Sequence, residues 1–310
     1  MAIIELQNLT KNFGPIRAVD ALTLQVDEGQ TVGFLGPNGA GKTTTIKILT
    51  NLIMATGGRA LLQGIDVTTD PKRALKNVGA VVETPEFYPY LNPVETLAYL
   101  GRIRGMNSKE IASRTDEVIR QVKLEQWSTT RIGKFSKGMK QRLAIAQALL
   151  HEPDILIPDE PTSGLDPRGM VEVREIIRGL KKERYTIFMS SHLLGEVQEV
   201  CDKAALIDHG KLLIYDTLDN LASLTKTAKL EVTSLSEVGD AVLSKIRAMQ
   251  GVREIARVSG SIFVVTLEGG STERAELLRD MMAEGVKVTG YTTVSPPLET
   301  MYMDLVKESR

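Results

Sequence analysis

The sequence predicts an α/β fold for the larger amino-terminal part of the chain and a small α+β domain after it. Two observations carry this prediction. From residue 31 to about residue 190, short apolar runs alternate with helical patterns, which is typical of a parallel sheet with crossover helices. From residue 229 the order changes to strand, helix, strand, strand, helix, strand, the split βαβ arrangement of ferredoxin-like domains. We therefore expect one domain at 1–224 and a second at 225–310.

Composition places the chain among folded globular proteins and excludes several classes. Its 310 residues suffice for two ordinary domains, and 42% hydrophobic with 25% charged residues argues against disorder. A formal net charge of -1 leaves no basic excess for nucleic acid, so we expect no nucleic-acid partner. The single cysteine, Cys201, allows no internal disulfide and is expected to be a buried apolar residue. No apolar run approaches the roughly 20 residues that span a bilayer, which favours a cytoplasmic location.

The predicted elements of the first domain follow from hydrophobic periodicity and turn residues. Its amino-terminal part is β-rich, and a helical insertion is expected at about 84–150. The expected strands are 3–6, 22–26, 31–35, 80–82, 155–157 and 186–189, and the expected helices are 44–49, 94–104, 109–122, 138–150 and 168–182.

The predicted elements of the second domain follow from the same reasoning. Ser259-Gly260 suits a two-residue hairpin turn. Pro296-Pro297 should break the chain before a last short helix. The expected strands are 229–234, 252–258, 261–267 and 286–292, and the expected helices are 237–249 and 271–284.

A glycine-rich segment between an apolar strand and a helix matches the phosphate-loop pattern G-x4-G-K-[ST]. Glycines let backbone N–H groups wrap around phosphate oxygens, and the helix N-terminus adds partial positive charge. Lys42 is expected to reach the β- and γ-phosphates of ATP, Thr43 to bind Mg²⁺, and Thr44 to contact phosphate. A plain glycine-rich turn that caps a helix is the alternative. The segment consists of Gly36, Pro37, Asn38, Gly39, Ala40, Gly41, Lys42 and Thr43.

Two adjacent carboxylates end the apolar strand 155–157. This form is typical of a site where Asp159 holds Mg²⁺, directly or through water, and Glu160 polarises the attacking water. An ordinary strand end with acidic turn residues remains the other interpretation.

Three further segments carry a family resemblance. They are Phe135-Ser136-Lys137-Gly138-Met139-Lys140-Gln141-Arg142, Ser163-Gly164-Leu165-Asp166 and Ser190-Ser191-His192. In this order around the two motifs above, the chain resembles the ABC ATPase family over about residues 3–220, with a signature segment, a D-loop and a switch histidine.

The resemblance implies that two ATPase domains enclose two ATP molecules head to tail, so a homodimer or a heterodimer with a homologous subunit is expected. Ser136 and Gly138 would bind the γ-phosphate held by the opposite protomer, with Asp166 in the D-loop. His192 would contact the γ-phosphate and the attacking water, and Phe13 would stack on adenine. The alternatives are a solvated basic helix face around Ser136, a structural histidine and a core phenylalanine.

Four residues depart from the family pattern. Glu83 stands where the family has the glutamine of the Q-loop, and we interpret it as a Mg²⁺ ligand whose charge makes coupling more dependent on Mg²⁺. Lys137 and Met139 replace a glycine and a glutamine of the signature, which should weaken contacts to ATP across the dimer. Pro158 removes an N–H from an expected central strand.

The resemblance implies an ATP-hydrolysing subunit that powers a separate membrane-spanning permease, to which it would bind on the inner face of the membrane. The segment 84–104, rich in proline and aromatic residues, would form the docking groove, unless it packs internally. The single ATPase domain and the tail Pro296-Pro297-Leu298-Glu299 resemble multidrug- and bacteriocin-type exporters, and the surroundings of Glu83 resemble the bacitracin- and lantibiotic-resistance branch. A soluble ABC ATPase acting on a macromolecular complex, and a regulatory nucleotide-binding protein with little turnover, stay open.

Overall fold

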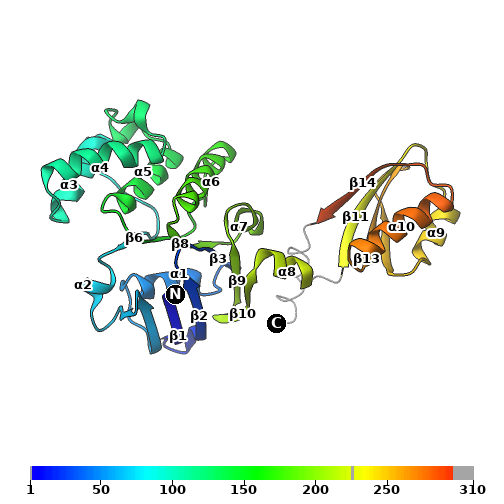
Figure 1. The fold of residues 1–310 in the computed structure, drawn as a ribbon, viewed down its shortest axis with the longest axis horizontal. Coiled ribbons are helices and arrows are strands. Elements are labelled where there is room, and N and C mark those ends of the chain that lie inside the picture. Colours follow the sequence, from blue (N-terminus) through cyan, green and yellow to red (C-terminus); the bar gives the residue numbers. More distant parts are fainter. Residues whose placement is uncertain (1, 225–226, 296–310) are drawn as a thin grey trace. The chain divides into compact units, whose positions relative to one another are not determined.

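The structure, a computed structural model of the chain, describes residues 2–224 and 227–295 (Figure 1). Two compact units make up the chain, residues 1–218 and 219–310. The division falls after the first residue of helix α8 (Leu218–Leu224), whereas the predicted domain boundary followed this helix. The last short helix predicted after Pro297 lies outside the described residues.

A four-stranded antiparallel sheet opens the first unit, in the order β2-β1-β4-β5. The predicted strands 3–6 and 22–26 are parts of two longer strands that pair as a hairpin. In β2 the alternate residues Leu22, Leu24 and Val26 are buried, as a sheet with one face on the core requires, whereas register shifts interrupt the alternation in β1. The two short strands of this sheet, β4 and β5, were not predicted, since glycines and polar residues interrupt their apolar pattern. The strands are β1 (Ala2–Phe13), β2 (Ile16–Asp27), β4 (Gly57–Leu62) and β5 (Ile65–Asp66).

A six-stranded sheet, in the order β10-β9-β3-β8-β7-β6, forms the centre of the first unit. Only β10 runs antiparallel to its neighbour. The inner strands are buried along their length, which explains their continuous apolar runs. In these parallel strands the carboxyl ends of β3, β7 and β8 reach the same edge of the sheet. The strands are β3 (Thr31–Leu35), β6 (Val78–Val81), β7 (Ile155–Pro158), β8 (Thr186–Ser191), β9 (Lys203–Asp208) and β10 (Lys211–Thr217).

Pro158 occupies a position of β7 where an N–H is not needed. The N–H of the next residue, Asp159, donates to Val81 O of β6 at 2.8 Å, so by strand alternation the nitrogen of Pro158 faces β8. The pairing of β7 with β8 is confined to Ile155 and Leu156. The proline therefore lies where the ladder toward β8 has already ended, which removes the conflict that the sequence suggested.

The helices predicted in the first unit are all present, with ends shifted by a residue or two. Asn92 and Asn107 cap the first two helices of the insertion, each in a reciprocal capping box with the glutamate three residues later. Two short helices, α2 (Pro71–Ala74) and α7 (Leu194–Val200), were not predicted. The others in the first unit are α1 (Lys42–Leu49), α3 (Pro93–Ile103), α4 (Ser108–Gln121), α5 (Lys137–Leu149) and α6 (Pro167–Lys182).

The second unit contains a four-stranded antiparallel sheet, in the order β12-β13-β11-β14. Its apolar core includes Leu230, Val232, Phe263 and Met281. The predicted order of elements is confirmed, and the ferredoxin-like assignment stays a prediction. The elements are β11 (Thr227–Ser234), α9 (Asp240–Arg247), β12 (Val252–Arg257), β13 (Ile262–Glu268), α10 (Ser271–Ala283) and β14 (Val288–Ser295).

The burial of Cys201 and the character of the helices bear on two expectations from the sequence. Cys201 is buried, and burial raises the pKa of its thiol, so it behaves as an apolar core residue. Within residues 2–224 and 227–295, no helix combines the length and the apolar character that crossing a membrane requires.

His151 should make the free energy of unfolding depend on pH. Burial, assisted by the nearby charge of Arg104, lowers the pKa of His151 to about 4, and its Nε2 lies 3.1 Å from Val78 O. An unfolded chain binds this proton near pH 6.5, so the stabilisation is complete above pH 6.5 and is lost as pH falls toward 4, by up to about 3 kcal/mol. Urea unfolding of wild type and His151→Gln at several pH values should show a smaller acid loss in the variant. Identical pH profiles would contradict this prediction.

Candidate active site

The glycine-rich loop joins β3 to α1, and two of its glycines tolerate no side chain. A Cβ on Gly36 would lie 2.5 Å from Ile207 O, and one on Gly41 would lie 2.3 Å from Ala18 O. Gly41 also has φ of 102°, in the left-handed region, immediately before the first residue of α1. The loop thus passes close to neighbouring backbone and then turns directly into the helix, whose N-terminus favours anions. Asn38 and Gly39 are exposed, Pro37 and Thr44 are half-buried, and Ala40 is buried.

Lys42 directs its ammonium group into this loop. The side chain is only 4% exposed, and its Nζ donates to Gly36 O at 2.8 Å and to Pro37 O at 3.1 Å. The same Nζ lies 3.2 Å from Oε1 of Glu160. The loop therefore holds one buried positive charge next to the carboxylate at the end of β7.

Asp159 and Glu160 are held at the end of β7 by a hydroxyl from β8. Ser190 Oγ donates to Asp159 Oδ1 at 2.5 Å and accepts from the N–H of Glu160 at 2.8 Å. Glu160 has φ of 44°, uncommon for a residue with a side chain, and this bond helps to hold it there. His192 Nδ1 lies 3.0 Å from Glu160 Oε2. The structure therefore brings Lys42, Glu160 and His192 together, with the glutamate in the middle.

A cavity of about 310 Å³ adjoins these residues. The three residues expected to bind a divalent cation line this cavity, namely Thr43, Asp159 and Glu83. Their hydroxyl and carboxylate oxygens are the ligands that Mg²⁺ prefers, and Mg²⁺ typically uses one or two carboxylates together with phosphate oxygens. The donor set therefore fits Mg²⁺ bound with a nucleotide. The cavity is lined by Thr43, Glu83, Thr84, Lys137, Gln141, Asp159, Glu160 and Ser163.

Glu83 reaches the cavity, but its carboxylate is engaged elsewhere. Its Oε1 lies 2.5 Å from Nζ of Lys47, a residue of α1 that the sequence reasoning did not single out. Glu83 also has φ of 64°. The structure thus gives this carboxylate a cationic protein partner at the edge of the predicted metal site.

The signature and D-loop residues lie at two helix starts and not with Lys42. Ser136 Oγ accepts from Met139 N at 3.2 Å and caps α5, and Asp166 Oδ1 accepts from Gly169 N at 3.1 Å and caps α6. A Cβ on Gly138 would lie 3.5 Å from Gly169 Cα, so the two helix starts are closely packed. Within this chain Ser136 and Asp166 cap helices, and their contact with a nucleotide held by a second protomer stays a prediction.

Lys137, which replaces a glycine of the signature, is attached to the D-loop. Its Nζ donates to Ser163 O at 3.0 Å, and both residues line the cavity. The predicted weakening of contacts across a dimer stays a prediction, and within one chain the lysine joins two motifs.

Phe13 lies at the end of β1 and is 49% exposed, so it is not the core residue of the alternative interpretation. Lys11 Nζ lies 4.9 Å from the centre of its ring. An exposed aromatic ring can stack on a base, as predicted, although this role is untested.

Several residues of the site were missed by the sequence reasoning. Gln141 and Thr84 line the cavity, Lys47 binds Glu83, and Ser190 links the Asp159 carboxylate to the backbone N–H of Glu160. Helical spacing offered one signal, because Lys47 follows Thr43 by four residues and so shares its face of α1. The bonds of Ser190 depend on the strand order, which the sequence did not provide.

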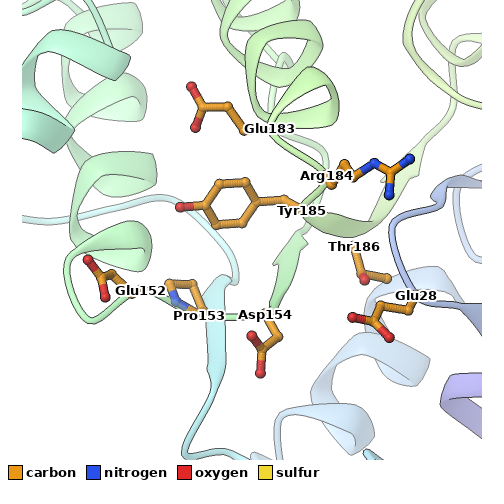
Figure 2. A pocket seen from close by; sticks show the side chains of 8 residues that line it. All are labelled: Glu28, Glu152, Pro153, Asp154, Glu183, Arg184, Tyr185 and Thr186. Atoms are coloured by element: carbon orange, nitrogen blue, oxygen red, sulfur yellow. The ribbon is translucent and has the colours of Figure 1, made fainter.

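A second cavity of about 310 Å³ lies at the opposite ends of β7 and β8 (Figure 2). In this view the ring of Tyr185 lies between Glu183 and Glu152. Three of the carboxylates that line it have partners: Asp154 accepts from Gln63 and Asn77, Glu183 from Gln121, and Glu152 pairs with Arg114. Ligands of parallel sheets bind beyond the carboxyl ends of the strands, so the cavity beside Lys42 is the better candidate.

Known proteins that are similar to this chain are ATP-binding proteins of transport and resistance systems. A family model described as ABC transporter matches residues 19–163. The bacitracin transport ATP-binding protein BcrA of Bacillus licheniformis is 46% identical over 220 residues, which cover 71% of each chain. The daunorubicin resistance ATP-binding protein DrrA2 of Streptomyces coeruleorubidus is 30% identical over 304 residues, which cover 97% of this chain and 94% of the relative.

Solved structures show the same fold over the first unit. The structure of an ATP-binding subunit of an ABC transporter has a TM-score of 0.64, is 30% identical, and covers 71% of this chain and 92% of its own. The dimeric cassette MJ0796 bound to ADP and Pi has a TM-score of 0.62 and covers 69% of this chain and 98% of its own, and at 24% identity it shows the fold alone. Cassettes of this kind act as dimers and with membrane permease subunits. With the glycine-rich loop, the paired carboxylates and His192 in place, the chain belongs to the ABC transporter family, as an ATP-binding subunit whose ATP hydrolysis is coupled to transport.

Proposed function

We propose that this subunit powers an exporter, with catalysis centred on Glu160. The observation that carries the catalytic part is the position of the Glu160 carboxylate, 3.2 Å from Lys42 Nζ and 3.0 Å from His192 Nδ1. A carboxylate there can polarise a water against the γ-phosphate, while the ammonium and the imidazole stabilise the charge that develops on the phosphoryl group. The names of relatives such as BcrA and DrrA2 support export as the direction of transport.

In this proposal ATP is bound as its Mg²⁺ complex. Thr43 and Asp159 hold the cation, which would neutralise phosphate charge, and Glu83 lies within the same cavity as a further oxygen donor. Phe13 stacks on adenine, and the amides of the glycine-rich loop receive the phosphates. Ser136, Gly138 and Asp166 complete the site of a second protomer, either a copy of this chain or a homologous subunit.

The membrane partner is proposed to dock on exposed tyrosines that follow the position of Glu83. Tyr88, Tyr90 and Tyr99 are 52%, 63% and 46% exposed. The ring of Tyr88 lies 5.6 Å from that of Tyr90 and 6.2 Å from that of Tyr99, so the three form one surface cluster. Exposed clustered aromatic rings are typical of binding surfaces, which favours docking over internal packing of this segment. Through this contact the subunit would be held on the inner face of the membrane.

Replacing Tyr88 and Tyr90 together by serine should weaken capture of the membrane subunit without lowering ATP binding. Loss of two aromatic anchors from an interface costs on the order of 2–4 kcal/mol, so recovery should fall at least about tenfold. The measurement is co-purification from detergent-solubilised membranes of cells that express the tagged subunit. Tyr215→Phe, far from this cluster in the sequence, is the matched control. Undiminished recovery of a membrane protein by the double variant would refute this docking surface.

A further inference from the structure

The ion pair between Lys47 and Glu83 lies at the edge of the cavity that we assign to Mg·ATP. Lys47 Nζ and Glu83 Oε1 are 2.5 Å apart, and they come from different elements, α1 and the segment after β6. Glu83 adopts φ of 64°, which costs of order 1 kcal/mol for a residue with a side chain. Its conformation is therefore held by surrounding contacts, and the bond to Lys47 is the ion pair in which it takes part.

The Glu83 carboxylate also lines the cavity in which we place the divalent cation. Lys47 follows Thr43 by four residues on α1, so the two side chains share a helix face. Glu83 lines the cavity together with Thr43 and Asp159. Glu83 therefore contacts the lysine ammonium and lines the same cavity as the oxygens that would hold a divalent cation.

Charge determines what this arrangement does. A family member with glutamine at the position of Glu83 carries no charge there, whereas this chain adds a negative charge beside the phosphates. Lys47 neutralises that charge through a direct contact. Because the side chains are 30% and 65% exposed, the pair is weak and sensitive to salt, and it can be redistributed when another cation arrives.

We propose that Lys47 is a positioning residue, which holds Glu83 at the edge of the nucleotide cavity and limits how strongly this carboxylate attracts the divalent cation of ATP. The proposal rests on the proposed function, namely on Mg·ATP binding in this cavity. In the proposal, Lys47 and the divalent cation compete for the Glu83 carboxylate. Removal of the lysine should therefore free the carboxylate and strengthen cation-dependent nucleotide binding.

The test is equilibrium binding, measured in Glu160→Gln protein so that turnover does not interfere. Binding of a fluorescent ATP analogue is titrated with Mg²⁺ in the parent, in Lys47→Gln, and in Lys47→Gln combined with Glu83→Gln. Lys47→Gln should lower the half-saturating Mg²⁺ concentration about two- to fivefold, the range expected for a partly exposed ion pair. Lys47→Arg should restore the parent value, and Lys72→Gln, an exposed lysine on α2, is the matched control.

Two results would overturn the proposal. One is an unchanged Mg²⁺ requirement in Lys47→Gln; the other is an equal shift when Glu83→Gln is already present, because the lysine then acts without the carboxylate. Salt provides a second measurement on the same two proteins. Raising salt from about 0.1 M to 1 M should reduce the difference between parent and Lys47→Gln protein, and a constant difference would count against the ion pair. Failure of the parent to bind nucleotide at any Mg²⁺ concentration would instead refute the proposed function.

Discussion

Glu160→Gln protein is expected to bind ATP normally and to lose its turnover. The amide has the size of the carboxylate and can still contact Lys42 and His192, but it cannot polarise a water as a base. Loss of a general base typically lowers the rate by about 10²- to 10⁴-fold. Steady-state release of phosphate measures kcat, and binding of a fluorescent ATP analogue measures affinity in the same preparations.

The control for this change is Glu28→Gln, because Glu28 lines the cavity at the other end of the strands. It removes the same charge and should leave kcat within about twofold of wild type, as surface substitutions usually do. If Glu160→Gln protein retained a tenth or more of wild-type turnover, another group would have to activate the water. A parallel loss of ATP affinity would place Glu160 in binding and not in catalysis.

Lys42→Ala is expected to remove both nucleotide binding and turnover. The ammonium is 4% exposed and donates to two loop carbonyls, Gly36 O and Pro37 O, so it is positioned for charged oxygens at the same place. Hydrogen bonds to charged groups contribute about 1.5–3 kcal/mol, which corresponds to about ten- to hundredfold weaker ATP binding. The contrast with Glu160→Gln, where only turnover falls, separates the two roles.

Stability must be measured beside affinity in this variant. Removing Lys42 leaves the Glu160 carboxylate and two loop carbonyls without their cation, so the nucleotide-free protein itself should lose stability. Thermal unfolding without nucleotide reports that loss, and Lys72→Ala, an exposed lysine on α2, provides the matched control. ATP affinity within threefold of wild type in folded Lys42→Ala protein would contradict a phosphate-binding role.

The helices of the insertion were predictable because their start signals are local. Asn92 and Asn107, each with a glutamate three residues later, give the two capping boxes that the structure contains. β9 and β10 were not predicted, and β4 begins with two glycines, so propensity alone did not reveal these strands. β4 and β9 pair with strands that are distant in sequence, β1 and β3, whereas β10 pairs with its neighbour β9.

The same distinction between local and long-range contacts explains what the structure shows at Pro158 and Lys137, two departures from the family pattern. Pro158 seemed to conflict with a central strand, but the pairing of β7 with β8 ends before it. Lys137 was read only as a weakened signature, yet its ammonium reaches Ser163 O. Both facts depend on where strands end and loops turn, which a one-dimensional pattern does not contain.

By itself the sequence determined the α/β class of the first unit, the order of elements in the second unit, and the contiguous motifs of the phosphate loop and the paired carboxylates. Each of these depends on neighbours along the chain, through periodicity, caps and glycine conformations. Only the tertiary structure decided which groups meet: Lys42 with Glu160, Glu160 with His192, and Lys47 with Glu83. Such contacts join residues brought together by the order of parallel strands, and their distances follow from that order and from side-chain rotamers.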